Sequence, residues 1–188
     1  MYQGQLRMRF IQMAEATFPL FEPILSNVAG VDVALGHIGE PELVAAGLWR
    51  DHPNCKAVWD WRELMRKLRR TPKRLDVSFY CGETLCGLMV ATISKSRVNV
   101  NVLYVEAAPD PAHPLKAKFL SVAIYVAELF AAWLNATHVS VSNPLVPVVD
   151  YYLDLGYRRT ARDRKRMDKG RSPRDKLLIK DLRDQGPF

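Results

Sequence analysis

The stretch SVSNPLVPVVDYYLDLGY, residues 140–157, says more about the fold than any other part of this sequence. Together with the two residues before it, the stretch opens as HVSVSN (138–143), in which valines alternate with polar residues at the period of two typical of a strand. The segment PLVPVVDYYLDL that follows predicts a short helix, because Gly156 stands where helices commonly end. A strand therefore leads almost directly into a short helix.

A long apolar segment precedes this strand. The proline-rich loop AAPDPAHP (107–114) leads into a helix that we expect from residue 115 to about residue 134. Apolar residues occupy both sides of this helix, so we expect it to be buried between layers. Strands on either side of a helical crossover run parallel in nearly all proteins. The strand before the loop and the strand at 138–143 are therefore predicted to be parallel.

Three further strands are indicated upstream. LDVSFYCGETLCGLMVATIS (75–94) predicts two strands joined at residues 82–84, and SRVNVNVLYVE (96–106) predicts a third, half-buried strand of period two. Short turns join them, so they form an antiparallel meander. The predicted fold class is α/β, with a mixed sheet in which the antiparallel meander is followed by a parallel β-α-β unit, and with helices on both faces.

The first 74 residues are expected to be helical. Pro19 and Pro23 would confine a helix there to short or kinked pieces, and two clearer helices are expected at 40–49 and 58–68. We expect one domain over residues 1–188, consisting of the helical part (1–74), the sheet core (75–170) and a charged C-terminal tail (171–188). Residues 157–169 are expected to form a final strand or an extended arm.

Composition excludes several classes of protein. The chain has 188 residues, of which 48% are hydrophobic and 25% charged, which is ordinary for a globular domain and unlike a disordered, collagen-like or disulfide-rich chain. No membrane span or signal peptide is indicated. Cys55, Cys81 and Cys86 form no metal-binding spacing and are expected to be reduced thiols in a cytoplasmic protein.

The net charge of +7 is concentrated in two basic clusters, at 62–74 and 158–169. The first cluster is most simply the solvated face of an amphipathic helix. Either cluster could instead attract an acidic partner such as RNA.

Three segments together resemble the GNAT superfamily of acyl-CoA-dependent N-acyltransferases. They are the hairpin FYCGETLCGLMVA, the strand and loop VNVNVLYVEAAP with the long helix after it, and SVSNPLVPVVDYYLDLGY, in which Asn143, Tyr152, Gly156 and Tyr157 stand at matching positions. The resemblance covers about residues 75–170. One part departs from the family pattern, because AHPLKAKFL has no glycine where the family usually has a glycine-rich pyrophosphate loop.

The resemblance implies transfer of an acetyl or other acyl group from acyl-CoA to a primary amine by direct attack, without a metal. It implies that Tyr152 is the general acid and that Glu106 is a candidate base. The cofactor-binding residues that it implies lie at the end of the fourth strand of the family, at the start of the long helix and in the next strand; they are Val105, Ala107, Lys116, Ala117, Lys118, Phe119 and Asn143. His113 could add charge beside the lysines.

The geometric requirement of this hypothesis is that the parallel segments near Glu106 and Ser142 separate and leave room for the thioester arm. The acceptor stays open among a small molecule, a protein amine and an aminoacyl-tRNA, and a homodimer is possible. The alternative function is a catalytically inactive GNAT-like binding or inhibitory module that acts on an acidic partner, RNA or protein; the missing glycines favour it.

Each candidate residue also has a structural interpretation. Tyr152 can be a core tyrosine, with Tyr151 able to take either part, and Glu106 an ordinary strand-end residue. Asn143 can cap the following helix. Other residues are weaker candidates: Tyr104 and His138 for catalysis, and Asn99 and Asn101 for an acceptor groove.

Overall fold

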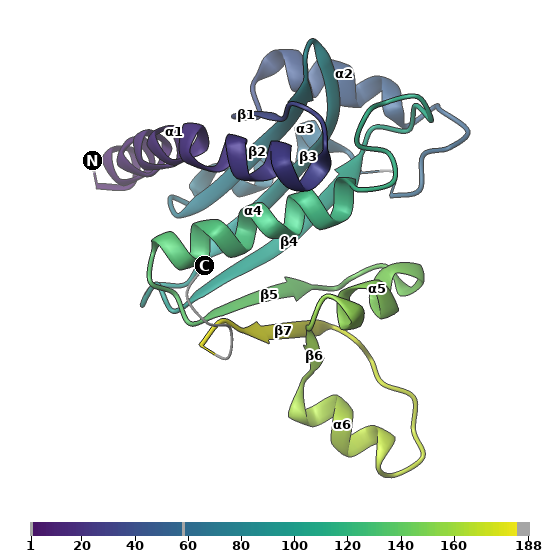
Figure 1. Ribbon diagram of the computed structural model, residues 1–188. Coiled ribbons are helices and arrows are strands. Elements are labelled where there is room, and N and C mark those ends of the chain that lie inside the picture. The colour runs from purple at the N-terminus through teal and green to yellow at the C-terminus, as the bar shows by residue number, and fades with distance from the viewer. Residues whose placement is uncertain (1, 58, 184–188) are drawn as a thin grey trace.

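The computed structural model describes residues 2–57 and 59–183, which form a seven-stranded mixed sheet with helices on both faces (Figure 1). The strand order is β1-β2-β3-β4-β5-β7-β6. The strands are β1 (Ala34–Gly36), β2 (Arg74–Cys81), β3 (Thr84–Ile93), β4 (Asn99–Ala107), β5 (His138–Ser142), β6 (Arg158–Arg159) and β7 (Leu177–Asp181). The helices are α1 (Tyr2–Ala29), α2 (Glu40–Trp49), α3 (Trp61–Lys67), α4 (Phe119–Trp133), α5 (Val149–Asp154) and α6 (Ala161–Met167), with short 3₁₀ turns η1 (Leu68–Arg70) and η2 (Val146–Val148).

The predicted order of pairing is confirmed. β2, β3 and β4 form the antiparallel meander, and β4 pairs with β5 in parallel across α4. β1 was not predicted; three residues carry too little pattern to stand out, and the strand exists because it pairs with β2.

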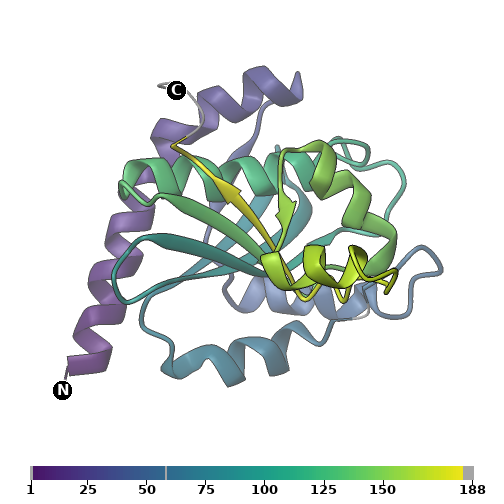
Figure 2. The same cartoon turned by 90° about the horizontal axis from the view of Figure 1, so that it is seen from below.

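Two hydrophobic clusters lie on opposite faces of the sheet. Figure 2 shows, from below, the helices that cover the two faces. The larger cluster packs α1 and α4 against the sheet through residues such as Phe21, Phe119 and Phe130. The smaller one packs α2 and α3 through Trp49 and Trp61. The sheet is therefore buried on both faces over the meander.

Of the short or kinked pieces expected at the N-terminus, the short pieces are wrong, because α1 continues through both Pro19 and Pro23. Its axis changes direction along its length (Figure 2), as prolines inside a helix make possible. Phe10, Phe18 and Leu25 are buried against the rest of the molecule, so tertiary packing offsets the backbone hydrogen bonds that the prolines remove.

The expected boundaries also need correction after residue 113. The long helix begins at Phe119, four residues later than expected, because turns occupy residues 114–118. The segment expected as a final strand or arm forms only the two-residue β6 and then α6. The expectation of a charged tail over residues 171–188 is wrong for residues 177–181, which form β7. This strand lies between β5 and β6 and pairs antiparallel with both.

Val58, expected inside the third helix, lies outside the described residues; that helix begins at Trp61. Among the described residues, no helix combines the length and the apolar character needed to cross a membrane.

Candidate active site

β4 and β5 are paired over only part of their length. Their parallel register runs from Asn99, opposite His138, to Val102, opposite Val141, while β4 continues to Ala107. The two strands therefore separate beyond Val102, as the sequence hypothesis required.

A polar ladder joins the two strands up to the point of separation. Asn99 donates to the Ser140 hydroxyl at 2.9 Å, and Asn101 accepts from the hydroxyls of Ser140 and Ser142 at 2.8 and 3.0 Å. Asn99 and Asn101 thus bind the neighbouring strand rather than line an acceptor groove. They strengthen the pairing just where it stops.

A β-bulge at Leu103 changes which side chains face which layer. Val102 pairs with Ala91 and Tyr104 with Val90, so Leu103 has no partner in β3. Before the bulge, Val102 packs in the α1/α4 cluster; after it, Tyr104 packs in the α2/α3 cluster, and Val105 returns to the α1/α4 side. A bulge re-aims the residues that follow it, and here it sends Glu106 toward α3.

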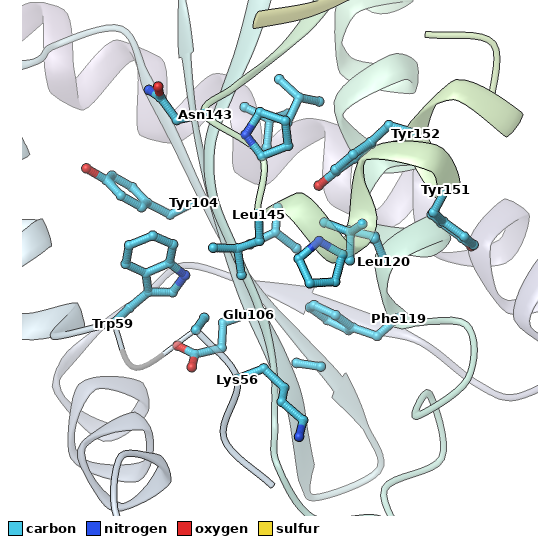
Figure 3. Close-up of a pocket in the computed structure, with 18 of the residues that line it drawn as sticks. Lys56, Trp59, Tyr104, Glu106, Phe119, Leu120, Asn143, Leu145, Tyr151 and Tyr152 are labelled. Carbon is cyan, nitrogen blue, oxygen red and sulfur yellow. The ribbon is translucent and has the colours of Figure 1, made fainter. Parts of the chain in front are cut away.

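A cavity of about 410 Å³ occupies the place where the strands separate. Its wall consists of residues from β4, β5, the start of α4, α5 and the loop before α3 (Figure 3). All but one of the residues that the resemblance implied line it: Val105, Glu106, Ala107, Lys116, Ala117, Phe119, Asn143 and Tyr152.

The backbone of β4 supplies hydrogen-bond donors to this cavity. Ala108 donates its N–H to Cys86 on β3, and residues facing one neighbour alternate along an antiparallel strand. The N–H groups of Glu106 and Tyr104 therefore face β3, whereas those of Val105 and Ala107 face the side from which β5 has departed. Two residues along a strand span roughly 6.6 Å, so each of these N–H groups can donate to a different acceptor, and one of them can hold an oxyanion.

Glu106 is a buried carboxyl group in the cavity wall, with 7% of its surface exposed. The Trp61 indole N–H donates to its Oε2 at 2.5 Å, and the Cys55 thiol donates to its Oε1 at 3.4 Å. Burial raises the pKa of Glu106, and these two donors oppose part of that rise. The carboxyl group therefore titrates nearer neutrality than an exposed glutamate and can exchange a proton.

Tyr152 and Tyr151 lie differently although they are neighbours in the sequence. Both residues line the cavity, but in Figure 3 the hydroxyl of Tyr152 points toward its middle, whereas the ring of Tyr151 is directed outward from its edge. Tyr152 is 4% exposed and packs edge-on against Tyr157. Burial raises its pKa above the ordinary value, so the phenol stays protonated near neutral pH.

The start of α4 lies against the cavity and packs closely against Gly87 of β3. A Cβ at Gly87 would lie 2.2 Å from the Phe119 ring and 2.6 Å from the Glu106 carbonyl oxygen, so only glycine fits there. The first N–H groups of a helix have no intrahelical acceptor, which leaves those of Phe119 and Leu120 available to a ligand. Lys116 lines the cavity beside them.

Lys118 and His113 differ from expectation. The Lys118 ammonium donates to the Ala29 carbonyl at 2.8 Å, and the side chain does not line the cavity. His113 is 3% exposed, and burial lowers its pKa, so it is neutral and adds no charge. Of the three basic side chains near this turn, Lys116 is the one in the cavity wall.

Sequence reasoning missed the loop before α3. Trp59 and Tyr104 pack edge to face at 5.1 Å in the cavity wall, and Lys56, which also lines the cavity, lies nearer to Glu106 (Figure 3). Within the described residues, the buried indole N–H of Trp59 has no hydrogen-bond partner. No local pattern marks this loop, because the residues of β4 that it contacts are more than forty positions away in the sequence.

The other candidates have structural roles. His138 lies at the first paired position of β5, away from the strand separation, where it contacts Thr137 and Asp181. Asn143 does not cap a helix: its backbone has a positive φ of 46°, and Leu145 precedes η2. Across residues 2–57 and 59–183, no cluster of three or more potential metal ligands occurs.

Comparison with known proteins places this geometry in context. No family model and no curated protein matches the sequence. The PaiA N-acetyltransferase of Thermoplasma acidophilum, solved with coenzyme A, superposes with a TM-score of 0.54 at 10% identity, over 80% of this chain and 99% of that one.

Two further solved structures are similar. An acetyltransferase of Bacillus subtilis in complex with CoA gives a TM-score of 0.52 at 16% identity, over 80% of this chain and 97% of that one. A spermidine N-acetyltransferase chimera, partly from Vibrio cholerae, gives 0.55 at 16% identity, over 81% and 96%. With the strand order, the parallel β4–β5 pair and the gap between them, these matches show that the chain has the GNAT N-acetyltransferase fold.

Proposed function

We propose that this protein is an N-acyltransferase that moves an acetyl or other acyl group from acyl-CoA to a primary amine. The observation that carries the proposal is the cavity between the separated β4 and β5, with Glu106, Tyr152 and two outward-facing backbone amides in its wall. The structural neighbours that hold coenzyme A support the same co-substrate.

The residues present fit an acyl-CoA. The gap between β4 and β5 is lined by backbone and apolar side chains, which suits a slender pantetheine arm. At the start of α4, the helix N–H groups and Lys116 suit the pyrophosphate, with a lysine point charge in place of the glycine-rich loop. Asn143 lies at the end of β5, where its amide can reach the arm.

The chemistry that we propose is direct attack. The amine nitrogen forms a bond with the thioester carbonyl carbon, the carbon–sulfur bond breaks, and an amide and a thiol result. One of the two outward-facing N–H groups, that of Val105 or that of Ala107, stabilises the developing oxyanion. Glu106 takes the proton that the amine loses, directly or through water, and Tyr152 donates a proton to the departing sulfur. Much of the rate enhancement then comes from positioning the two reactants.

The acceptor is expected to be an amine that enters beside Trp59, Tyr104 and Lys56. The cavity wall holds two lysines, Lys56 and Lys116, and Glu106 as its one carboxylate within the described residues.

Reduced Cys81 and Cys86 on the paired strands β2 and β3 support a cytoplasmic location.

Isothermal titration with acetyl-CoA, coenzyme A and longer acyl-CoAs tests the proposal. We expect heat of binding from at least one of them, and thiol release when amines are then added. Lys116→Ala should weaken binding by about three- to ten-fold, since one surface-type charge contact is lost. Lys118→Ala, on the same turn but bonded to Ala29, is the matched control and should bind normally.

An absence of heat with all three ligands would contradict the enzyme proposal. That result would favour the alternative, an inactive binding module, which the glycine-free turn at 113–118 supports.

A further inference from the structure

The positive charge of this protein is concentrated in one segment outside the cavity. Residues 158–176, here called the basic arm, hold ten basic and three acidic residues, an excess of seven that equals the net charge of the whole chain. The remainder of the sequence is therefore electrically balanced. The basic arm comprises β6, α6 and the return to β7, and in Figure 1 it projects beyond the edge of the sheet.

Two of the three acidic residues of the basic arm do little to neutralise its surface, and the third, Asp168, is exposed. Asp163 is buried and accepts hydrogen bonds from the Thr160 hydroxyl and the Arg174 backbone N–H. Asp175 pairs with Arg159 at 2.7 Å, which is the only ion pair of the arm among the described residues. Most of the basic side chains of the arm are exposed: Arg158, Arg162, Arg164, Lys165, Lys169, Arg171, Arg174 and Lys176.

The other basic cluster is organised differently. On α3, Arg62 pairs with Glu40, and Glu63 pairs with both Arg66 and Lys67. These ion pairs neutralise part of that helix face, although Arg69 and Arg70 after its end are exposed and make no ion pair within the described residues. A larger share of the basic side chains is therefore compensated in this cluster than in the basic arm.

The basic arm is held in a defined shape. Thr160 caps α6, and the Arg166 guanidinium donates to the Ser172 carbonyl at 3.0 Å across the turn. The C-terminal end of the arm is fixed beside the cavity, because Asn143, which lines the cavity, donates its backbone N–H to the Lys176 carbonyl at 2.8 Å. The charges are therefore displayed on an ordered support.

The composition of the basic arm indicates which polyanion fits. Seven of its ten basic residues are arginines, whose planar guanidinium groups match phosphate oxygens in a bidentate manner. It has no aromatic residue, and Met167 is its one exposed large hydrophobic residue among those described. It therefore lacks both the apolar face of a membrane-bound helix and the apolar anchors of a protein interface.

We propose that the basic arm binds the phosphate backbone of nucleic acid, without reading base sequence. The arm has no aromatic side chain on which bases could stack, so we expect phosphate contacts of its arginines and lysines to supply most of the affinity. This surface is separate from the acyl-transfer proposal and would exist in an inactive GNAT-like protein as well.

Fluorescence anisotropy with labelled single-stranded RNA and double-stranded DNA of several sequences tests the proposal. We expect binding that weakens steeply between about 50 and 200 mM salt and varies little with sequence. The triple variant R162Q/K165Q/K169Q should bind at least about ten-fold more weakly and show a flatter salt dependence. Within the described residues these three side chains make no hydrogen bond or ion pair, so the fold should be unaffected.

The matched control is K67Q/R69Q/R70Q at the end of α3 and in η1, which removes the same charge from exposed positions. It should change the affinity by less than about two-fold, since long-range charge effects are screened at these salt concentrations. Binding of either RNA or DNA supports the proposal, and their relative affinities identify the source. No binding by the native protein, equal losses in both variants, or equal competition by polyglutamate or anionic vesicles would overturn it.

Discussion

Glu106 combines features that an exposed glutamate at a strand end would not have. It is buried, it accepts hydrogen bonds from Trp61 and Cys55, and its pKa is raised by burial. A raised pKa brings a carboxylate closer to the range in which a general base works best. Substitution of this one side chain therefore tests the proposed chemistry directly.

Replacing Glu106 by Gln should lower kcat by about a hundred-fold or more, because the amide cannot accept the proton. For the native enzyme, kcat/KM should rise with pH through the raised pKa of Glu106, and the variant should lack this limb. An unchanged pH profile in E106Q would show that another group is the base.

The same substitution has a predicted effect on stability. Since the folded protein holds the Glu106 proton more tightly than the unfolded chain, the stability linked to this group is complete below its ordinary pKa of 4.5 and is lost as pH rises through the raised value. E106Q carries no charge at any pH, so it should be more stable than the native protein at neutral pH. Urea unfolding at acid and neutral pH measures this difference.

Tyr152→Phe should lower kcat by about a hundred-fold and leave the affinity for acyl-CoA nearly unchanged, because only the proton donor to sulfur is removed. Tyr151→Phe is the control and should retain activity, since Tyr151 lies at the edge of the cavity and its ring is directed outward (Figure 3). Steady-state kinetics with thiol detection distinguishes the two. Similar losses in both variants would remove Tyr152 from the proposed acid role.

At the scale of elements, the site depends on how α4 is seated against β3. Gly87 allows the Phe119 ring to lie directly on the strand, and Phe119 is the first residue of α4. The position of the helix start, and with it the available N–H groups, follows from a close contact between backbone and ring.

Gly87→Ala should therefore destabilise the fold by about 1–3 kcal/mol through overpacking, and should weaken acyl-CoA binding as α4 shifts. Gly47→Ala is the control: nothing lies within 4 Å of a Cβ there, and Gly47 is inside α2. That variant should gain up to about 1 kcal/mol, as alanine favours the helix. Thermal unfolding and titration calorimetry measure both effects. Unchanged stability and unchanged acyl-CoA binding in G87A would contradict this account of how α4 packs on β3.

At the scale of the whole molecule, one buried ion pair ties the inserted strand β7 to α4. Lys180 donates to both oxygens of Glu128 at 2.9 Å, and the Tyr157 hydroxyl donates to Oε1 of Glu128 at 3.1 Å. The pair joins segments fifty-two positions apart in the sequence. It connects the C-terminal strand to the helix that opens onto the cavity.

Lys180→Met should cost about 3–5 kcal/mol, because the Glu128 carboxylate stays buried without its partner. The double variant E128L/K180M should recover most of that loss, leaving about 1 kcal/mol for the unpaired Tyr157 hydroxyl. Chemical denaturation of both variants checks this. If the double variant were as unstable as the single one, packing rather than the uncompensated charge would be the cause.

The sequence by itself determined the order of the elements between β2 and α5, the antiparallel meander and the parallel β4–β5 pair. It did so because these depend on local periodicity, on short turns such as Gly82–Glu83, and on the handedness of crossovers. Its resemblance to the GNAT superfamily also pointed to Glu106 and Tyr152, both of which line the cavity.

Tertiary structure alone decided the rest. The bulge at Leu103, the insertion of β7, the continuation of α1 through its prolines and the approach of Trp59 to Tyr104 all depend on partners distant in the sequence. Burial and strand pairing across such distances offset weak local preferences, and no local pattern records them. The cavity lies where β4 continues to Ala107 beyond its last pair with β5, Val102 opposite Val141, so that this part of its edge has no paired strand among the described residues.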